Sequence, residues 1–349
     1  MKNAPSTRAS MRSLRSLLAA VAAAILVLPV FASRAHATFE IMVPAYFYPA
    51  PGTQGATDWA TMASAASAGY QITAILNPEA GPGAAQDGLY LNAAYGVRCG
   101  VCSQVLGFTY TRYGERPIEQ VMADIDKYYR FYPVSGIFLD EMVSEYMLRP
   151  DSVGKTYVDP LGATVTIKPA SFYLDYYARL YTYIQGKTAT TPFVKPNGTP
   201  VATGTRVVGN VGINAAEISL TGGFGYGKMA DDVIVLENTA KFLTDGSYTP
   251  SAWNFNSGYT DDIGYLIHTT PTLTDALGAL ATIAKNNGGI AYVTDGPVGP
   301  DTFGHLSPYW SSLIAACTFC PPTTVPEPSS ALLALIGMGA LAVRRRRSA

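Results

Sequence analysis

Histidine is scarce in this sequence, and its scarcity limits the chemistry that the chain can support. Only three of the 349 residues are histidine, and two of them, His268 and His305, lie beyond the N-terminal segment. Hydrolases that use zinc need several such ligands, so the sequence argues against a zinc hydrolase or deacetylase and implies no metal at its site. No Gly-x-Ser-x-Gly turn is present either, which argues against serine hydrolases of that type.

Charge is also low, at 14% of residues, against about 25% in an average domain. Without residues 1–37 and 321–349, the chain keeps 15 Lys and Arg against 24 Asp and Glu, a net charge near −9. Such a chain is a poor nucleic-acid binder and would attract a cationic partner. Gly222 to Lys228 mimics a phosphate-binding loop, but Met229 replaces the residue that must bind magnesium, so no cofactor is expected.

The first 37 residues have the pattern of a secretory signal peptide. Lys2 and three arginines precede an apolar run from Leu17 to Val30, and Ala35-His36-Ala37 supplies small residues for cleavage. A transmembrane anchor is the alternative, but the apolar run is short for a span. We therefore expect the chain to use the export machinery and to act in the periplasm, at the cell surface or in the extracellular matrix.

The last 29 residues, 321–349, contain a linker and a second targeting pattern. Val325-Pro326-Glu327-Pro328 precedes an apolar run from Ala331 to Val343, and Arg344 to Arg347 follow. This order resembles the PEP-CTERM sorting signal of Gram-negative bacteria. The resemblance implies transient association with the inner membrane, with the basic end inside, and processing by an exosortase-type enzyme. The positive-inside rule favours the same orientation.

Residues 38–320 are expected to form a single domain of the α/β class. Short apolar strands alternate with helical segments, and eight such units in a domain of this length favour a closed (β/α)8 or TIM barrel. The strands are expected at Glu40–Tyr46, Gln71–Leu76, Gln104–Phe108, Gly136–Leu139, Arg206–Asn210, Asp232–Leu236, Asp262–His268 and Gly289–Val293. Residues 150–168 and 188–205 are expected to be loops.

Three carboxylates follow two of these apolar strands. Asp140 and Glu141 end the fourth strand, and Glu237 ends the sixth. Two carboxyls across a cleft are what glycoside hydrolysis requires, because one protonates the leaving oxygen while the other attacks the sugar or activates water. Strand alternation predicts that Asp140 and Glu141 point to opposite sides. The alternative to a catalytic role is a structural one, in which these acids pair with arginines such as Arg112.

Further side chains at or near the strand ends are candidates to bind substrate. Aromatic rings stack on sugar faces, and a protonated amino sugar adds a cation–π attraction. Ordinary core packing is the alternative for any single ring, and a structural role is equally open for the histidine. The candidates are Tyr46, Tyr48, Asn77, Tyr110, Tyr113, Asn210, His268, Tyr292 and Asp295.

The four cysteines form two Cys-x-x-Cys pairs, Cys99 with Cys102 and Cys317 with Cys320. Both pairs are expected at the N-terminal face of the barrel, opposite the acids. In an exported protein they predict a structural clasp made by disulfides, with a zinc site as the alternative. The spacing does not decide which cysteines are bonded to each other.

The strand-end motifs together resemble the spherulin-4-like family, also called spherulation-specific family 4. They are Pro44 to Pro49, Asn77-Pro78 with Gly81 to Gly83, Gly107 to Gly114, Gly136 to Glu141, Val235 to Glu237 and Tyr292 to Asp295. The resemblance implies a barrel glycosidase that cuts α-1,4-linked galactosamine or N-acetylgalactosamine polymers, with the family's acids at Asp140, Glu141 and Glu237. Asn210-Val211-Gly212 departs from the Asn-Pro-Gly that the family often shows.

We therefore expect an exported glycoside hydrolase of the endo-α-1,4-galactosaminidase type. In this hypothesis Asp140 is the nucleophile, Glu237 is the general acid and base, and Glu141 balances charge or holds substrate; Asp140 and Glu141 could exchange roles. The expected partner is an amino-sugar polysaccharide that can carry positive charge. The alternatives are a non-catalytic protein that binds exopolysaccharide and a structural protein of the cell surface.

Overall fold

This computed structural model describes residues 39–100, 102–159, 162–187, 193–195, 197–213, 229–255 and 259–320. The predicted signal peptide, the predicted tail at 321–349 and the glycine-rich segment at 222–228 lie outside the described residues. None of the described helices combines the length and apolar character that a membrane crossing requires.

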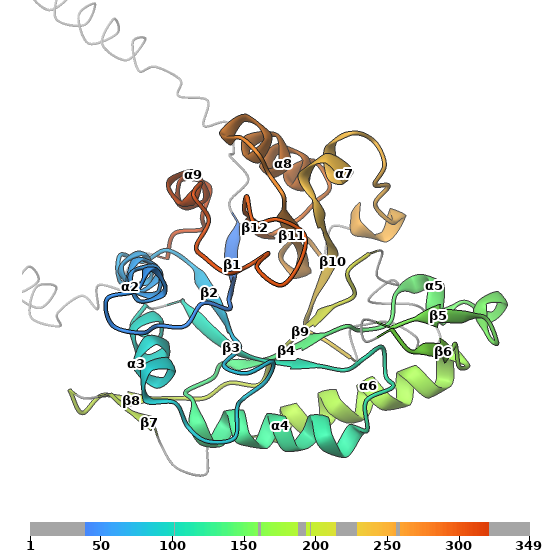
Figure 1. Cartoon of the computed structure of the whole chain (residues 1–349), viewed down its shortest axis with the longest axis horizontal. Coiled ribbons are helices and arrows are strands. Elements are labelled where there is room, and N and C mark those ends of the chain that lie inside the picture. The colour runs from blue at the N-terminus through green and yellow to red at the C-terminus, as the bar shows by residue number, and fades with distance from the viewer. Residues whose placement is uncertain are drawn as a thin grey trace, which may run out of the picture. The chain divides into compact units, whose positions relative to one another are not determined.

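The core of the molecule is a closed barrel of parallel strands (Figure 1), which confirms the predicted (β/α)8 fold. Around the barrel the strands follow the order β1-β12-β11-β10-β9-β4-β3-β2. Most of their residues are buried on both faces, which is why each strand reads as a continuous apolar run. The strands are β1 (Glu40–Ala45), β2 (Ile72–Leu76), β3 (Gln104–Tyr110), β4 (Gly136–Asp140), β9 (Arg206–Asn210), β10 (Asp232–Thr239), β11 (Ile263–His268) and β12 (Ile290–Val293).

Helices surround the barrel in the outer layer that Figure 1 shows. They are α2 (Gln54–Ser67), α3 (Gly88–Val97), α4 (Ile118–Phe131), α5 (Glu145–Leu148), α6 (Ala170–Gln185), α7 (Ala240–Thr244), α8 (Leu273–Lys285) and α9 (Trp310–Ala315). Short 3-10 helices occupy Pro150–Ser152, Ala252–Phe255 and Thr260–Asp262. The side chain of Thr53 caps the N-terminus of α2. Asp58, within this helix, is buried and accepts the backbone N–H of Leu306.

The two segments that the sequence pattern assigns to loops contain short antiparallel hairpins. Residues 150–168 hold the pair β5 (Thr156–Val158) and β6 (Thr164–Thr166), and residues 188–205 hold β7 (Phe193–Val194) and β8 (Pro200–Val201). The loop interpretation was therefore wrong for these residues. The first hairpin has a role near the acids, because its Asp159 forms an ion pair with Arg112.

A buried ion cluster crosses the N-terminal end of the barrel. Arg206 at the start of β9 pairs with Glu40 of β1 at 2.7 Å and with Asp232 of β10 at 2.6 Å. All three side chains are less than a fifth exposed, so the cluster ties together strands from opposite sides of the barrel floor. Charged groups that are buried in this way are stable only when they form ion pairs with groups of opposite charge.

The start of β4 lies unusually close to β9, its neighbour in the barrel. A Cβ atom at Gly136 would lie 1.9 Å from the carbonyl oxygen of Arg206. The strand pair Gly136↔Arg206 therefore requires glycine at this position. This close pairing fixes the register of β4 and so the height at which Asp140 emerges.

Candidate active site

Asp140 and Glu237 emerge from strands that are separated by β9. Asp140 is the last residue of β4, and Glu237 lies on β10 beyond a register shift between Ile234 and Leu236. Asn210, the last residue of β9, lies between them. All three therefore project at the C-terminal end of the barrel, where side chains on adjacent parallel strands can converge on one substrate.

A single side-chain amide joins the two acids. The Nδ2 atom of Asn210 donates one hydrogen bond to Oδ1 of Asp140 at 2.8 Å and another to Oε2 of Glu237 at 2.5 Å. Since both oxygens are hydrogen-bonded to the same nitrogen, the distance between them cannot exceed the combined length of the two hydrogen bonds, 5.3 Å. The backbone N–H of Gly212 donates to Oδ1 of Asn210 and so fixes the amide with its NH2 group toward the acids.

The environment of this pair favours one shared proton. Burial raises the pKa of Asp140 to about 6, although hydrogen bonds from the Glu141 backbone and from Asn210 oppose this shift. Burial and then the Asp140 carboxylate raise the pKa of Glu237 to about 7. Two carboxyl groups that share one hydrogen-bond donor repel each other when both are ionised, which is unfavourable. Asp140 accepts a further hydrogen bond, from the backbone of Glu141, that Glu237 lacks, so Asp140 is the better carboxylate and Glu237 the better proton holder.

Glu141 does not continue the strand, so simple alternation does not describe it. Its φ of 54° lies in the left-handed region, which is strained for a glutamate. Its carbonyl accepts the N–H of Tyr113 at 2.7 Å and the hydroxyl of Thr111 at 2.8 Å. Its Oε2 is buried and finds no hydrogen-bond partner among the described residues. Burial and then Asp140 raise the pKa of Glu141 to about 7.

Two predicted tyrosines lie within the electrostatic reach of the acids. Burial and then Asp140 and Glu237 raise the pKa of Tyr46 well above its usual value. Burial, Glu141, Asp140 and Glu237 together raise the pKa of Tyr113 to about 12. Tyr113 adopts a positive φ of 55°. The structure therefore gathers both rings and the acids into one group.

Phe303 belongs to the same region but is absent from the sequence-based candidates. Its ring makes edge contacts with Tyr46 at 5.9 Å and His268 at 6.4 Å, and it packs at an angle against Tyr292 at 6.3 Å. It lies in the segment after β12, eight residues beyond the last strand-end motif, which ends at Asp295. A lone phenylalanine in such a segment gives no signal in the sequence.

Four of the predicted substrate residues have structural partners. Arg116 lies 4.3 Å above the ring of Tyr110, and Tyr48 donates to Asp87 at 2.9 Å. Asn77 accepts the N–H of Gly81, and the buried hydroxyl of Tyr292 accepts the N–H of Ser307. Tyr110 pairs with Asp140 across the two strands, whereas among the described contacts none joins the other three to the acids. Their roles as substrate ligands stay predictions.

The remaining predicted residues are His268, the last residue of β11, and Asp295, which follows β12. Burial lowers the pKa of His268, whose Nδ1 lies 2.9 Å from the hydroxyl of Thr269. Asp295 is half-exposed and pairs with His305 at 2.9 Å. The ring contact between His268 and Phe303 connects this side of the barrel mouth with Tyr46.

The four cysteines form one disulfide, between Cys102 and Cys320. Cys99 is a free exposed thiol and Cys317 a free buried one. Each Cys-x-x-Cys pair thus contributes one cysteine to a clasp, and the zinc alternative was wrong for this arrangement. Within the described ranges, no group of three or more His, Cys, Asp and Glu side chains could hold a metal ion.

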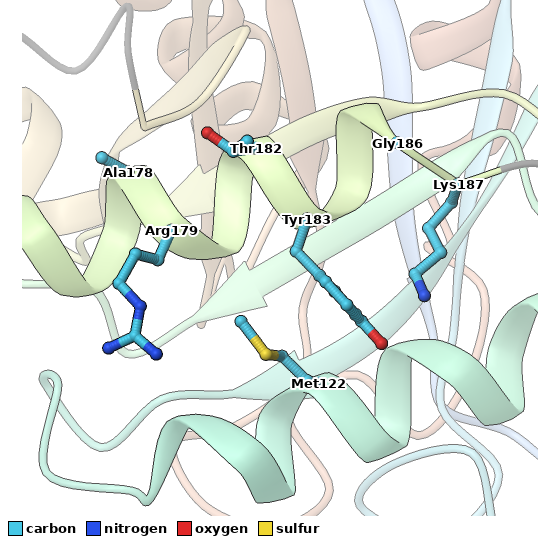
Figure 2. Close-up of a pocket in the computed structure, with 7 residues that line it drawn as sticks. All are labelled: Met122, Ala178, Arg179, Thr182, Tyr183, Gly186 and Lys187. Atoms are coloured by element: carbon cyan, nitrogen blue, oxygen red, sulfur yellow. The ribbon is translucent and has the colours of Figure 1, made fainter.

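A pocket of about 570 Å³ lies elsewhere, between α4 and α6 (Figure 2). Figure 2 shows Met122 pointing up from one helix toward Arg179 and Tyr183 of the other. None of its lining residues comes from the end of a barrel strand. This pocket is therefore separate from the acid group at the barrel mouth.

Known proteins are similar to this chain in sequence or in fold. Residues 40–317 match the family model described as spherulation-specific family 4, and residues 324–348 match the PEP-CTERM protein-sorting motif. The chain is 25% identical over 291 residues to Spherulin-4 of Physarum polycephalum, over 79% of this chain and 69% of that protein. The crystal structure of Aspergillus clavatus Sph3 in complex with GalNAc superposes with a TM-score of 0.55 at 21% identity, over 80% of this chain and 97% of that one. The similarity along nearly the whole barrel shows that the chain belongs to the spherulation-specific family 4.

Proposed function

We propose that this chain is an exported glycoside hydrolase that cleaves an amino-sugar polysaccharide with Asp140 and Glu237. The observation that carries the proposal is the amide of Asn210, which holds these two carboxyls together at the barrel mouth. Family membership and the likeness in fold to Sph3 support it. The sorting motif at residues 324–348 supports export to the cell surface or the surrounding matrix.

The two acids divide the reaction according to their hydrogen bonds. Asp140, whose ionised form is stabilised by both Asn210 and the Glu141 backbone, attacks the anomeric carbon, while protonated Glu237 gives its proton to the leaving glycosidic oxygen. The product of this step is a glycosyl ester on Asp140. Glu237, now ionised, takes a proton from water, which attacks the ester and releases the sugar.

The spacing of the acids favours retention of the anomeric configuration. Carboxyls about 5–5.5 Å apart are typical of retaining glycosidases, and about 6.5–9.5 Å is typical of inverting ones. The nearest oxygens of Asp140 and Glu237 are at most 5.3 Å apart, the sum of the two Asn210 hydrogen bonds. The short distance between these two oxygens supports the retaining arrangement.

The substrate that we propose is a polymer of α-1,4-linked galactosamine and N-acetylgalactosamine. Sph3, whose fold is similar, was solved with GalNAc. Asp140, Glu141 and Glu237 also give the mouth an excess of acid, because Arg112 is already paired with Asp159. A partly deacetylated, cationic chain would be attracted to such a mouth. Glu141 would balance charge or hold the sugar, while Tyr46 and Tyr113 offer rings beside the acids.

The test is hydrolysis of partially deacetylated galactosaminogalactan by the purified protein and by Asp140→Asn and Glu237→Gln. Each variant should lose at least about 10³-fold in kcat, since each removes a group that acts on the reacting atoms. Glu119→Gln, which changes an exposed acid on the outer helix α4, is the matched control. Full activity in both site variants would disprove the assignment. Binding without any cleavage would instead indicate a polysaccharide-binding protein.

The stereochemical part has its own measurement. NMR spectra that are recorded during the first minutes of hydrolysis should show the α-anomer of the new reducing end before mutarotation. Initial release of the β-anomer would contradict the retaining mechanism while leaving the hydrolase itself intact.

A further inference from the structure

A groove of about 640 Å³ separates α2 from α9 in the outer layer of the barrel. On one side α2 presents only short side chains, and on the other α9 presents Trp310 and Ile314. Tyr70 also lines the groove. The lining residues are Thr57, Ala60, Thr61, Ser64, Ala65, Ala68, Tyr70, Trp310, Ser311 and Ile314. None of them carries a charge, so the groove suits an apolar segment.

The described chain ends at the edge of this groove. Cys320 donates its backbone N–H to the carbonyl of Gly69 at 2.7 Å, directly beside Tyr70. The ring of Phe319 packs on Tyr70 with centroids 5.5 Å apart, yet Phe319 remains 52% exposed. The disulfide to Cys102 holds the end of the chain at this place. Whatever follows residue 320 therefore starts beside the groove.

The sequence that follows has the length and composition to fill it. Residues 321–330 are polar and rich in proline, and such a stretch reaches about 31 Å when extended. Residues 331–343 are thirteen apolar or glycine residues, which span about 20 Å as a helix, close to the length of about 21 Å for the fourteen residues of α2. The same run is short for a membrane core of about 30 Å.

We propose that the groove between α2 and α9 receives the apolar segment 331–343 of the same chain whenever this segment is outside a membrane. Docking would cover the segment and the exposed side of Trp310 and Phe319 together, and would leave Arg344 to Arg347 in water. The groove would then be a storage site that keeps the unprocessed chain from associating through its tail. This inference does not depend on the proposed reaction.

The experiment places a photo-crosslinking amino acid at position 64, in the middle of the groove, in the full chain in detergent-free buffer. The matched control carries it at position 182, in the pocket of similar volume between α4 and α6 (Figure 2), which is flanked by Arg179 and Lys187. Crosslinked peptides are identified by mass spectrometry. Position 64 should crosslink to residues 331–343 at least ten times more than position 182 does.

A mixture of isotopically heavy and light chains separates docking within one chain from docking between copies. Crosslinks that join heavy to light chains would show a dimer contact and overturn the proposal. Equal crosslinking at positions 64 and 182, or none at 64, would do the same. As a second variant, Leu335→Asp should reduce the crosslink from position 64 at least ten-fold, whereas Leu335→Met should retain it. An undiminished crosslink in Leu335→Asp would also refute apolar docking.

Discussion

Replacing Asn210 by alanine should move the pH dependence of hydrolysis without removing either acid. The variant loses the hydrogen bonds of 2.8 Å to Asp140 and 2.5 Å to Glu237. Both bonds lower the pKa of the carboxyl that accepts them, because they stabilise its ionised form. In Asn210→Ala the two pKa values should therefore rise from about 6 and about 7.

The expected shift follows from the strength of a hydrogen bond to a charged group. Such a bond contributes about 1.5–3 kcal/mol, and one pKa unit corresponds to about 1.4 kcal/mol. The acidic limb of the profile, which reports ionised Asp140, should thus move up by about 1–2 pH units. At pH 6, where about half of Asp140 is ionised in the parent protein, kcat/KM should fall about 5–50-fold, and part of the loss should be recovered at higher pH.

The assay is kcat/KM on a soluble amino-sugar oligomer between pH 4 and 9. Asn238→Ala is the matched control, because the oxygen of this neighbouring amide accepts only the backbone N–H of Thr239 in the described contacts. Its acidic limb should stay within about 0.3 units of the parent protein, since no bond to an acid is lost. If Asn210→Ala lost activity equally at every pH, the amide would act on substrate and not through the acids.

Three further predictions concern stability, each measured by urea denaturation. Burial raises the pKa of Glu237 from 4.5 to about 7, so the folded state loses stability as the pH rises through this window. At pH 8 the free energy of unfolding of Glu237→Gln should therefore be roughly 1–3 kcal/mol higher than that of the parent protein. At pH 4 this difference should be absent. Cys102→Ser breaks the disulfide and should cost about 2–5 kcal/mol, while Cys99→Ser, at an exposed free thiol, should stay within about 0.5 kcal/mol. Arg206→Met removes the ion-pair partner of Glu40 and Asp232 and should lower the free energy of unfolding by about 3–5 kcal/mol. An unchanged urea midpoint would contradict a stabilising role for this buried ion cluster.

The barrel was predictable because its strands carry an unambiguous local signal. Strands that are buried on both faces, such as Ile137 to Leu139 and Val233 to Leu236, must be apolar throughout, and that requirement is visible in sequence. Helix α3 lacks such a signal, because Gly88 starts it and a Gly- and Pro-rich segment precedes it. The N-cap of α3 can nevertheless be recognised in the sequence, because Asp87 is a preferred residue type there and its side chain accepts the N–H groups of Leu89 and Tyr90.

The sequence indicated which residues are candidates for the site, but it did not indicate how these residues contact one another. Asp140, Asn210 and Glu237 each end an apolar run, but the contact between them depends on the order of strands in the closed barrel and on the irregular register of β10. The turn at Glu141 could not be found by counting alternation, because bonds from Thr111 and Tyr113 of another loop hold its left-handed backbone. These long-range constraints leave no trace in local sequence.

The disulfide between Cys102 and Cys320 also determines how the protein would respond to a pulling force. A load applied to the chain beyond residue 320 enters the fold at this bond and passes covalently to the segment before β3, 218 residues earlier in the chain. It therefore bypasses the few backbone hydrogen bonds that hold residues 317–320 against Phe39 and Gly69. A barrel tethered at its C-terminal end could thus bear the drag of a polymer network without being peeled open from that end.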